Sequence, residues 1–370
     1  MPEPGRAPVL VAAGGTGGHL FPAEALAAAL TRRGVAVHLA TDRRAARYGE
    51  AFADDAVHVI ASATLRARNP IAAARTAAML GSGLFQAWGL IDRLKPAAVV
   101  GFGGYPTIPP VLAAAWRRVP TVIHDANAVI GRANRFLAPR VTAIATTFPD
   151  LFRDRPELAA KATVTGNPVR PAVVAVAATP YPEPGQRLRL LVVGGSQGAR
   201  ILADVVPGAI GHLGVDLRMR LSIVQQAREE DIERVRNAYA SLSVTAEVAP
   251  FFSDLPVRMA ATHLVVSRSG ASTVAELAAI GRPSILIPLP HALDQDQFAN
   301  AGVLESAGGA IRVVQKDFTP RRLAADIAAL AASAPRLVGM ATAARSMGRL
   351  DAADRLATLV LNVAGLEPRS

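Results

Sequence analysis

Short apolar runs alternate with longer helical stretches along the chain, in two successive series. The first series consists of the runs APVLVAA, VAVHLAT, AVHVIA, PAAVVGFGG, PTVIHD and VTAIATT. Alanine and leucine dominate from Pro22 to Arg33, and Pro22 and Gly34 stand where proline and glycine favour the start and end of a helix. Continuous apolar strands between helices are typical of a parallel sheet covered on both faces.

A segment rich in proline and glycine, TGNPVRPAVVAVAATPYPEPGQ, indicates a linker near residues 166–186. The second series follows, with the runs LRLLVVGG, RMRLSIVQQ, SVTAEVAP, HLVVSRSG, PSILIPLP and GAIRVV. Thr319 and Pro320 then suit a helix cap and a first helical residue. We therefore expect two doubly wound α/β domains, residues 1–168 and 169–345, and a helical segment over residues 346–370.

Composition narrows the class of protein. The chain has 370 residues, 51% of them hydrophobic, which is enough for two cores. Cysteine is absent, which excludes a disulfide scaffold, thiolate metal sites and cysteine catalysis. The N-terminus does not have the pattern of a secretory signal, and no apolar run reaches the roughly 18 residues of a membrane span.

The chain is basic, with a formal net charge of +11. Such a charge suits an anionic membrane, a phosphorylated ligand or nucleic acid, and the alternative is a solvated arginine-rich surface. Aromatic residues make up only 5% and no basic run occurs, so we expect no nucleic-acid partner.

The same glycine turn occurs twice, as AAGGTGGH (residues 12–19) and as VGGSQGA (residues 193–199). Each follows an apolar strand and precedes a helix, which suits phosphate binding. Neither is a Walker A motif, and both fit the dinucleotide-binding pattern poorly. A nicotinamide oxidoreductase remains an alternative, although it usually needs only one such half. Two such halves that face each other across a cleft are the hallmark of GT-B glycosyltransferases.

Two further segments suit a nucleotide sugar. In SRSGASTVAEL, residues 271–273 begin a helix whose N–H groups could hold a diphosphate, and Glu276 could bind ribose hydroxyls. The alternative for Glu276 is an acid favoured by the helix dipole. In HALDQDQFANA, Asp294 and Asp296 could ligate Mg²⁺ or Mn²⁺, but a loop and helix cap is the favoured interpretation. We expect no metal site and no cofactor, with a divalent cation left open.

Assembled in order, these segments resemble the MurG family, the UDP-N-acetylglucosamine:lipid I N-acetylglucosaminyltransferases of bacterial peptidoglycan synthesis. The resemblance covers almost the whole chain and rests on GGTGGHLFPA, GFGGYPTIPP, IHDANAVIGRANRFLA, TGNPVR, VVGGSQGAR, PFFSDLPVRMAATHLVVSRSGASTVAEL, GRPSILIPLP and DQDQFANA. It implies a GT-B fold in which residues 346–370 cross back to the first domain. It also implies inverting transfer of GlcNAc from UDP-GlcNAc to the C4 hydroxyl of MurNAc in lipid I, giving lipid II for cell-wall growth, cell shape and division.

Matching positions imply site residues. The two glycine turns, the start of the helix at residues 271–273 and the loops after the strands would bind substrate. Glu276 would bind the ribose, Phe252 would lie at the uracil edge and Gln297 would bind GlcNAc. The full set is Thr16, Gly17, Gly18, Asn127, Arg170, Ser196, Gln197, Gly198, Phe252, Arg268, Ala271, Ser272, Thr273, Glu276, Gln295 and Gln297. Thr16, Gly17 and Gly18 would contact the donor or the acceptor pyrophosphate.

Two candidates remain for the general base. His19 ends the first glycine turn, and a histidine suits base catalysis near neutral pH. Asp125 is the other, but the family pattern has glutamate there and glutamine at Ala126. The shorter Asp125 and the missing amide of Ala126 place that role in doubt. Asp296 also departs from the family, which usually has histidine or glutamine.

A lipid acceptor requires contact with the bilayer. Apolar side chains recur at helical spacing between Ile71 and Ile91, flanked by basic residues, and a second aromatic–basic cluster is WRR from Trp116. The expected membrane residues are Met79, Leu80, Leu84, Phe85, Trp88 and Trp116. The alternative is a stripe that faces the core. We expect a peripheral enzyme on anionic phospholipid at the cytoplasmic face of the inner membrane, beside other cell-wall synthesis proteins. The runner-up function is a GT-B transferase with another lipid acceptor, such as diacylglycerol.

Overall fold

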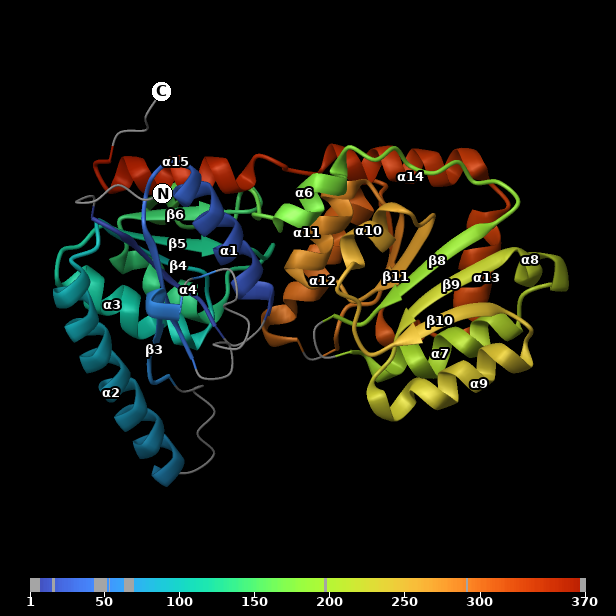
Figure 1. The fold of residues 1–370 in the computed structure, drawn as a ribbon, viewed down its shortest axis with the longest axis horizontal. Helices are drawn as coiled ribbons and strands as arrows, with labels where there is room; N and C mark the ends of the chain where they lie inside the picture. Colours follow the sequence, from blue (N-terminus) through green and yellow to red (C-terminus); the bar gives the residue numbers. More distant parts are fainter. Residues whose placement is uncertain are drawn as a thin grey trace. The chain divides into compact units, whose positions relative to one another are not determined.

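The computed structural model describes residues 7–14, 17–42, 52, 54–62, 70–195, 198–290 and 292–366. The chain forms two compact units, the first made of Met1–Arg170 and Leu350–Ser370 and the second of Pro171–Arg349. Figure 1 shows each unit as a sheet covered by helices.

The first unit alternates strands and helices, and its last helix comes from the end of the chain. Its strands are β1 (Val9–Ala12), β2 (Val37–Thr41), β3 (Val57–Val59), β4 (Ala98–Gly101), β5 (Thr121–Asp125), β6 (Ala143–Thr146) and β7 (Ala162–Val164). Its helices are α1 (Gly17–Arg32), α2 (Pro70–Leu94), α3 (Ile108–Trp116), α4 (Arg132–Leu137), α5 (Pro156–Ala159) and α15 (Ala352–Val363), with short 3₁₀ turns at Asp54–Ala56, Tyr105–Thr107 and Ala138–Arg140.

The described strands of this unit pair in parallel in the order β3-β2-β1-β4-β5-β6-β7. Alternate residues of β1 enter two cores. Val9 and Val11 pack with α1 and α15, whereas Leu10 and Ala12 pack with α2, α3 and α4. This doubly covered sheet explains why the strands are apolar throughout.

The second unit repeats the plan. Its strands are β8 (Leu188–Val193), β9 (Leu221–Gln226), β10 (Thr245–Ala249), β11 (Leu264–Ser267), β12 (Ser284–Leu286) and β13 (Ala310–Arg312). Its helices are α6 (Pro171–Ala177), α7 (Arg200–Gly211), α8 (Val215–Arg220), α9 (Ile232–Ser241), α10 (Leu255–Ala260), α11 (Ala271–Ile280), α12 (Asp296–Ser306), α13 (Pro320–Ala331) and α14 (Ala334–Ser346), with 3₁₀ turns at Glu229–Asp231, Leu293–Gln295 and Gln315–Asp317.

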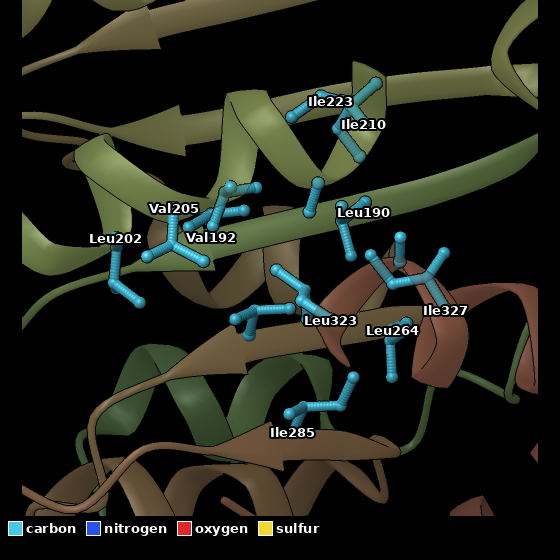
Figure 2. Packing of buried hydrophobic residues seen from close by; sticks show 14 of the residues in the cluster. Leu190, Val192, Leu202, Val205, Ile210, Ile223, Leu264, Ile285, Leu323 and Ile327 are labelled. Atoms are coloured by element: carbon cyan, nitrogen blue, oxygen red, sulfur yellow. The ribbon is translucent and has the colours of Figure 1, made fainter. Parts of the chain in front are cut away.

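These strands are also parallel, in the order β10-β9-β8-β11-β12-β13. Figure 2 shows one face of the sheet, where Leu190 and Val192 of β8 pack with side chains of α7 and α13. The order of the strands reverses direction beside β8 in this sheet and beside β1 in the other. Ligands of open α/β sheets bind at such positions. Both positions carry a glycine turn.

Three local expectations differ from the structure. The helix expected to start at Pro22 begins at Gly17, because proline's fixed φ is compatible with a helix and only one helical hydrogen bond is lost. The run RMRLSIVQQ is a strand only from Leu221, since Val215–Arg220 form α8. The expected linker contains α6. By contrast, the start of α13 is confirmed, with the Thr319 side chain accepting a hydrogen bond from the Arg322 N–H.

Within the described ranges, no single helix is both long and apolar enough to cross a membrane. One pair, α13 and α14, reaches that length and composition only together, and the pair is bent by 98°.

Candidate active site

The first glycine turn joins β1 to α1. Gly15 and Thr16 lie outside the described residues, while Gly17 and Gly18 are the first residues of α1. Gly14 is closely packed, since a Cβ there would lie 3.1 Å from Pro106 and 3.3 Å from the Asp42 carboxylate. The turn after β4 therefore packs directly against the turn after β1.

His19 is half-buried at the start of α1. Its Nδ1 lies 3.1 Å from the Gly14 carbonyl oxygen, which can only accept a hydrogen bond, so Nδ1 carries the proton. Burial lowers the pKa of His19, and the ring is neutral at neutral pH. A neutral ring with its proton on Nδ1 offers the lone pair of Nε2, which is what a general base requires.

Asp125, the other base candidate, ends β5 and is buried. Its carboxylate accepts hydrogen bonds from the backbone N–H groups of Asn127 (3.1 Å) and Gly131 (2.9 Å), and from Asn134 Nδ2 (3.0 Å). These bonds fix the 127–131 loop, and they point to positioning rather than proton transfer. Asn134, which sequence reasoning missed, also donates to the His124 carbonyl oxygen at 2.9 Å.

His124 is fully buried on β5. Its Nε2 lies 3.0 Å from the Gly166 carbonyl oxygen, and its ring lies 5.4 Å from that of Phe102. Burial lowers the pKa of His124 to about 4, because the charged form would lose its hydration.

We expect this histidine to make the protein sensitive to acid. The folded-state pKa of about 4 lies below the ordinary value of 6.5, so the unfolded chain binds the proton first as pH falls. The free energy of unfolding should drop by about 3 kcal/mol between pH 6.5 and pH 4 on this account. Urea denaturation across that range measures it. In His124→Phe, which keeps an aromatic ring but cannot titrate, the drop should be smaller by that amount, and equal drops would contradict the assignment.

Arg170 lies at the end of the first unit, with its guanidinium 4.5 Å from the ring of Phe21 on α1. This contact connects the TGNPVR segment to the helix that carries His19. Asn127, the other expected donor contact in this unit, is half-buried in the loop held by Asp125.

In the second unit, the glycine turn joins β8 to α7. Ser196 and Gln197 lie outside the described residues. Gly195 and Gly198 adopt positive φ values of 84° and 65°, which glycine tolerates readily. The Gly194 N–H donates to Gln226 Oε1 at 3.1 Å, so the end of β9 supports the turn.

The diphosphate site expected from the sequence lies at the N-terminus of α11. Gly270 caps it without a side-chain hydrogen bond, and Ala271, Ser272 and Thr273 are half-buried in the first turn. Glu276 follows one turn later and is only 5% exposed. The N-terminal end of a helix favours an anion.

The loop before α12 has an unusual backbone. Asp294 and Gln295 adopt left-handed φ values of 60° and 54°, which cost energy for residues other than glycine and cluster at functional sites. Gln297 Oε1 accepts a hydrogen bond from the Leu289 N–H at 3.0 Å. Burial raises the pKa of Asp296, with the nearby Asp294 adding to the effect. In the described part of the chain, no group of three metal-ligating side chains occurs.

Arg268 and Phe252 are held by neighbours. The Arg268 guanidinium donates to the carbonyl oxygens of Ile287 and Pro288 and to Gln315 Oε1, and burial lowers its pKa. Phe252 is buried, with the Arg258 guanidinium 4.5 Å from its ring. Both side chains are therefore held in place by neighbours within the second unit.

Aromatic side chains are exposed on the helices of the first unit. Phe85 on α2 is 82% exposed and Trp116 on α3 is 58% exposed. Met79 is also exposed, while Leu80, Leu84 and Trp88 are half-buried. Sequence reasoning missed Phe136 on α4, an exposed residue whose ring lies 4.4 Å from the Arg140 guanidinium; the signal was its position between Arg135 and Arg140.

The comparisons with known proteins agree on one family. The C-terminal domain of glycosyltransferase family 28 matches residues 189–356, and its N-terminal domain matches residues 9–146. A Rhodopseudomonas palustris (strain BisB18) protein called UDP-N-acetylglucosamine--N-acetylmuramyl-(pentapeptide) pyrophosphoryl-undecaprenol N-acetylglucosamine transferase is 63% identical over 98% of this chain and 97% of its own. A Bradyrhizobium protein of the same name is 61% identical over 97% and 98%.

Solved structures extend the comparison. The crystal structure of Acinetobacter baumannii MurG has a TM-score of 0.78 at 29% identity, covering 96% of this chain and all of that one. A Neisseria meningitidis UDP-GlcNAc 2-epimerase has a TM-score of 0.68 at 14% identity, covering 96% and 99%, and shows the shared fold alone. These matches agree with the two parallel-sheet domains, each of which has a glycine turn after its first strand. The chain therefore belongs to the MurG family of GT-B glycosyltransferases, within glycosyltransferase family 28.

Proposed function

We propose that this chain is an inverting glycosyltransferase that moves GlcNAc from UDP-GlcNAc to the C4 hydroxyl of MurNAc in lipid I. The product is lipid II, the precursor of peptidoglycan. The observation that carries the proposal is the 63% identity over nearly the full length to a transferase whose name states the donor, the acceptor and the sugar transferred. The start of α11 followed by buried Glu276 supports it independently, because a helix N-terminus one turn before a carboxylate suits a diphosphate joined to a ribose.

The donor would bind to the second unit. Backbone N–H groups of Ala271, Ser272 and Thr273 hold the diphosphate, and Glu276 accepts hydrogen bonds from the ribose hydroxyls. By family resemblance, Ser196, Gln197 and Gly198 of the second glycine turn would contact the phosphates, and backbone beside Phe252 would read uracil. Gln295 in the strained loop and Gln297 in the first turn of α12 would bind GlcNAc hydroxyls.

The chemistry would take place at the first unit. Nε2 of His19 accepts the proton of the acceptor hydroxyl while that oxygen attacks the anomeric carbon from the face opposite UDP, which inverts the centre. Helix N–H groups stabilise the negative charge that grows on the departing UDP. Asp125 holds the 127–131 loop, and Asn127 and Arg170 complete the donor contacts.

Acceptor choice separates this proposal from its nearest alternative. Labelled GlcNAc from UDP-GlcNAc should pass to a short-chain lipid I analogue and not to diacylglycerol. Transfer to diacylglycerol alone would retain the donor site and overturn the acceptor. Slow hydrolysis of UDP-GlcNAc without transfer to either lipid would agree with the proposed fold and donor site. It would contradict both lipid I and diacylglycerol as the acceptor.

The exposed aromatic residues of α2 and α3 would contact the membrane. The first unit contains 22 Lys and Arg against 14 Asp and Glu, whereas the second contains 18 against 15. Arg117 lies beside this surface, 5.1 Å from the Trp88 ring, and it pairs with Asp92. Exposed apolar side chains within a basic domain suit an anionic lipid surface. We therefore place the enzyme at the cytoplasmic face of the inner membrane, near other cell-wall synthesis proteins.

Charge placed on this surface should release the enzyme from lipid. Phe85→Asp combined with Trp116→Asp should lower binding to phosphatidylglycerol vesicles at least 10-fold, because each buried aromatic side chain contributes about 1.5–3 kcal/mol. Sedimentation with vesicles measures the bound fraction. Met219→Asp, at a residue of the second unit that is 77% exposed, is the matched control and should bind as the wild type does. Equal binding by all three proteins would contradict the membrane surface.

A further inference from the structure

The turn after β4 forms a flat floor beneath the His19 ring. A Cβ on Gly104 would lie 3.2 Å from Cε1 and 3.3 Å from Nδ1 of His19, and one on Gly103 would lie 3.7 Å from Cδ2 and Nε2. A Cβ on Gly103 would therefore make ordinary van der Waals contact with the imidazole. A Cβ on Gly104 would be too close, and the ring or the turn would have to give by a few tenths of an ångström.

Gly104 holds this place through a conformation that other residues rarely adopt. Its φ and ψ are 76° and 162°, a region that is essentially restricted to glycine. Buried Thr107 fixes the orientation of its carbonyl, which accepts hydrogen bonds from the Thr107 hydroxyl at 2.8 Å and the Thr107 N–H at 3.2 Å. The floor is thus rigid and not a loose loop.

The Gly14 carbonyl completes the enclosure. It accepts the Nδ1–H of His19 and lies 3.5 Å from the position of a Gly104 Cβ. Among the described residues, Gly14 is the hydrogen-bond partner of the ring, through Nδ1, and none is found for Nε2. The Nδ1 side of the ring is therefore fixed by backbone, and Nε2 keeps its lone pair.

We propose that the Gly103–Gly104 turn is a positioning element for His19, which fixes the ring plane and, with the Gly14 carbonyl, the Nδ1–H tautomer. The inference rests on the proposed function, since it serves His19 as the base. In that step the acceptor O–H bond breaks and its proton passes to Nε2. The oxygen forms the new bond to the anomeric carbon, and the bond to UDP breaks with its electron pair on the leaving phosphate.

The test is Gly104→Ala with two readouts. At saturating substrates kcat should fall about 3- to 10-fold, because the added Cβ makes the ring give by a few tenths of an ångström, less than the 1 Å misplacement that costs about 100-fold, while the KM for UDP-GlcNAc stays within about twofold. The ¹⁵N spectrum of histidine-labelled protein should show the Nδ1–H tautomer for His19 in the wild type and its loss in the variant. A merely structural role for Gly104 would not move that spectrum.

Gly34→Ala is the matched control. Gly34 has a φ of 77°, close to that of Gly104, but a Cβ there would meet nothing within 4 Å. It should lose stability through backbone strain and keep kcat and the His19 spectrum. Equal kcat values for the two folded variants, or an Nε2–H tautomer in the wild type, would overturn the inference.

Two further measurements cover the cases in which Gly104→Ala does not fold or the wild type is inactive on lipid I. If Gly104→Ala does not fold, Thr107→Val removes only the hydroxyl that holds the Gly104 carbonyl, and it should lower kcat about 3- to 10-fold. An unchanged kcat and spectrum would overturn the inference. If the wild type does not act on lipid I, the proposed function fails, and the spectra still decide whether the turn fixes the tautomer.

Discussion

Glu276→Ala is expected to raise the KM for UDP-GlcNAc about 10- to 100-fold while kcat stays within about threefold. Glu276 is 5% exposed one turn into α11, where a carboxylate can accept two hydrogen bonds from a ribose. Hydrogen bonds to a charged group contribute about 1.5–3 kcal/mol, and they bind the ground state and the transition state alike. Initial rates at varied UDP-GlcNAc and saturating lipid I measure both constants.

Two variants sharpen this measurement. Glu276→Gln keeps the shape of the side chain, so it separates lost charge from a cavity. Glu230→Ala removes a carboxylate of the same unit that is 67% exposed, and it should leave KM unchanged. A fall in kcat with an unaltered KM in Glu276→Ala would place this residue outside the ribose site.

His19→Ala is expected to lower kcat 10²- to 10⁴-fold with a small change in the KM for UDP-GlcNAc, because a positioned general base contributes about that factor. We also expect a particular dependence of kcat on pH. Burial lowers the pKa of His19, so the base stays neutral below pH 6.5 and kcat falls only when pH drops through that lowered value.

The control for this variant is His212→Ala, at an exposed histidine of the second unit. It should retain both kcat and the pH profile. A loss below about 10-fold in His19→Ala would remove His19 as the base and make Asp125 the next residue to test. If kcat of the wild type fell already above pH 6.5, the neutral-ring explanation would be wrong.

Most of the fold could be predicted from local sequence pattern. Buried parallel strands such as Val9–Ala12 are continuously apolar, and Thr319–Pro320 marks a helix start by side-chain chemistry alone. Pro22 suggested a helix start because proline is favoured at the first helical position, whereas it lies inside α1. α8 was missed because six residues with three charges carry no clear helical period.

The candidate site was less predictable, because its contacts join residues far apart in the chain. The spacing of the motifs indicated Glu276 and His19, but nothing local connects Gly104 with His19 or Asn134 with Asp125. Likewise, the sequence puts Arg268 just before the helix that starts at Ala271, and only the structure shows its guanidinium held by Ile287, Pro288 and Gln315. Hydrogen-bond partners of this kind are decided by tertiary structure.

The return of the chain to the first unit at α15 has a consequence for synthesis on the ribosome. Leu356, Ala357, Val360 and Leu361 are fully buried against α1 and the first sheet, so that core lacks one wall until α15 emerges. At about 5–20 residues per second, translation of Pro171–Arg349 takes about 10–35 seconds. The second domain, being continuous in sequence, can finish folding during that interval. The first-made domain is therefore completed last, and during the wait its open apolar face is the part of the nascent chain that chaperones would need to cover.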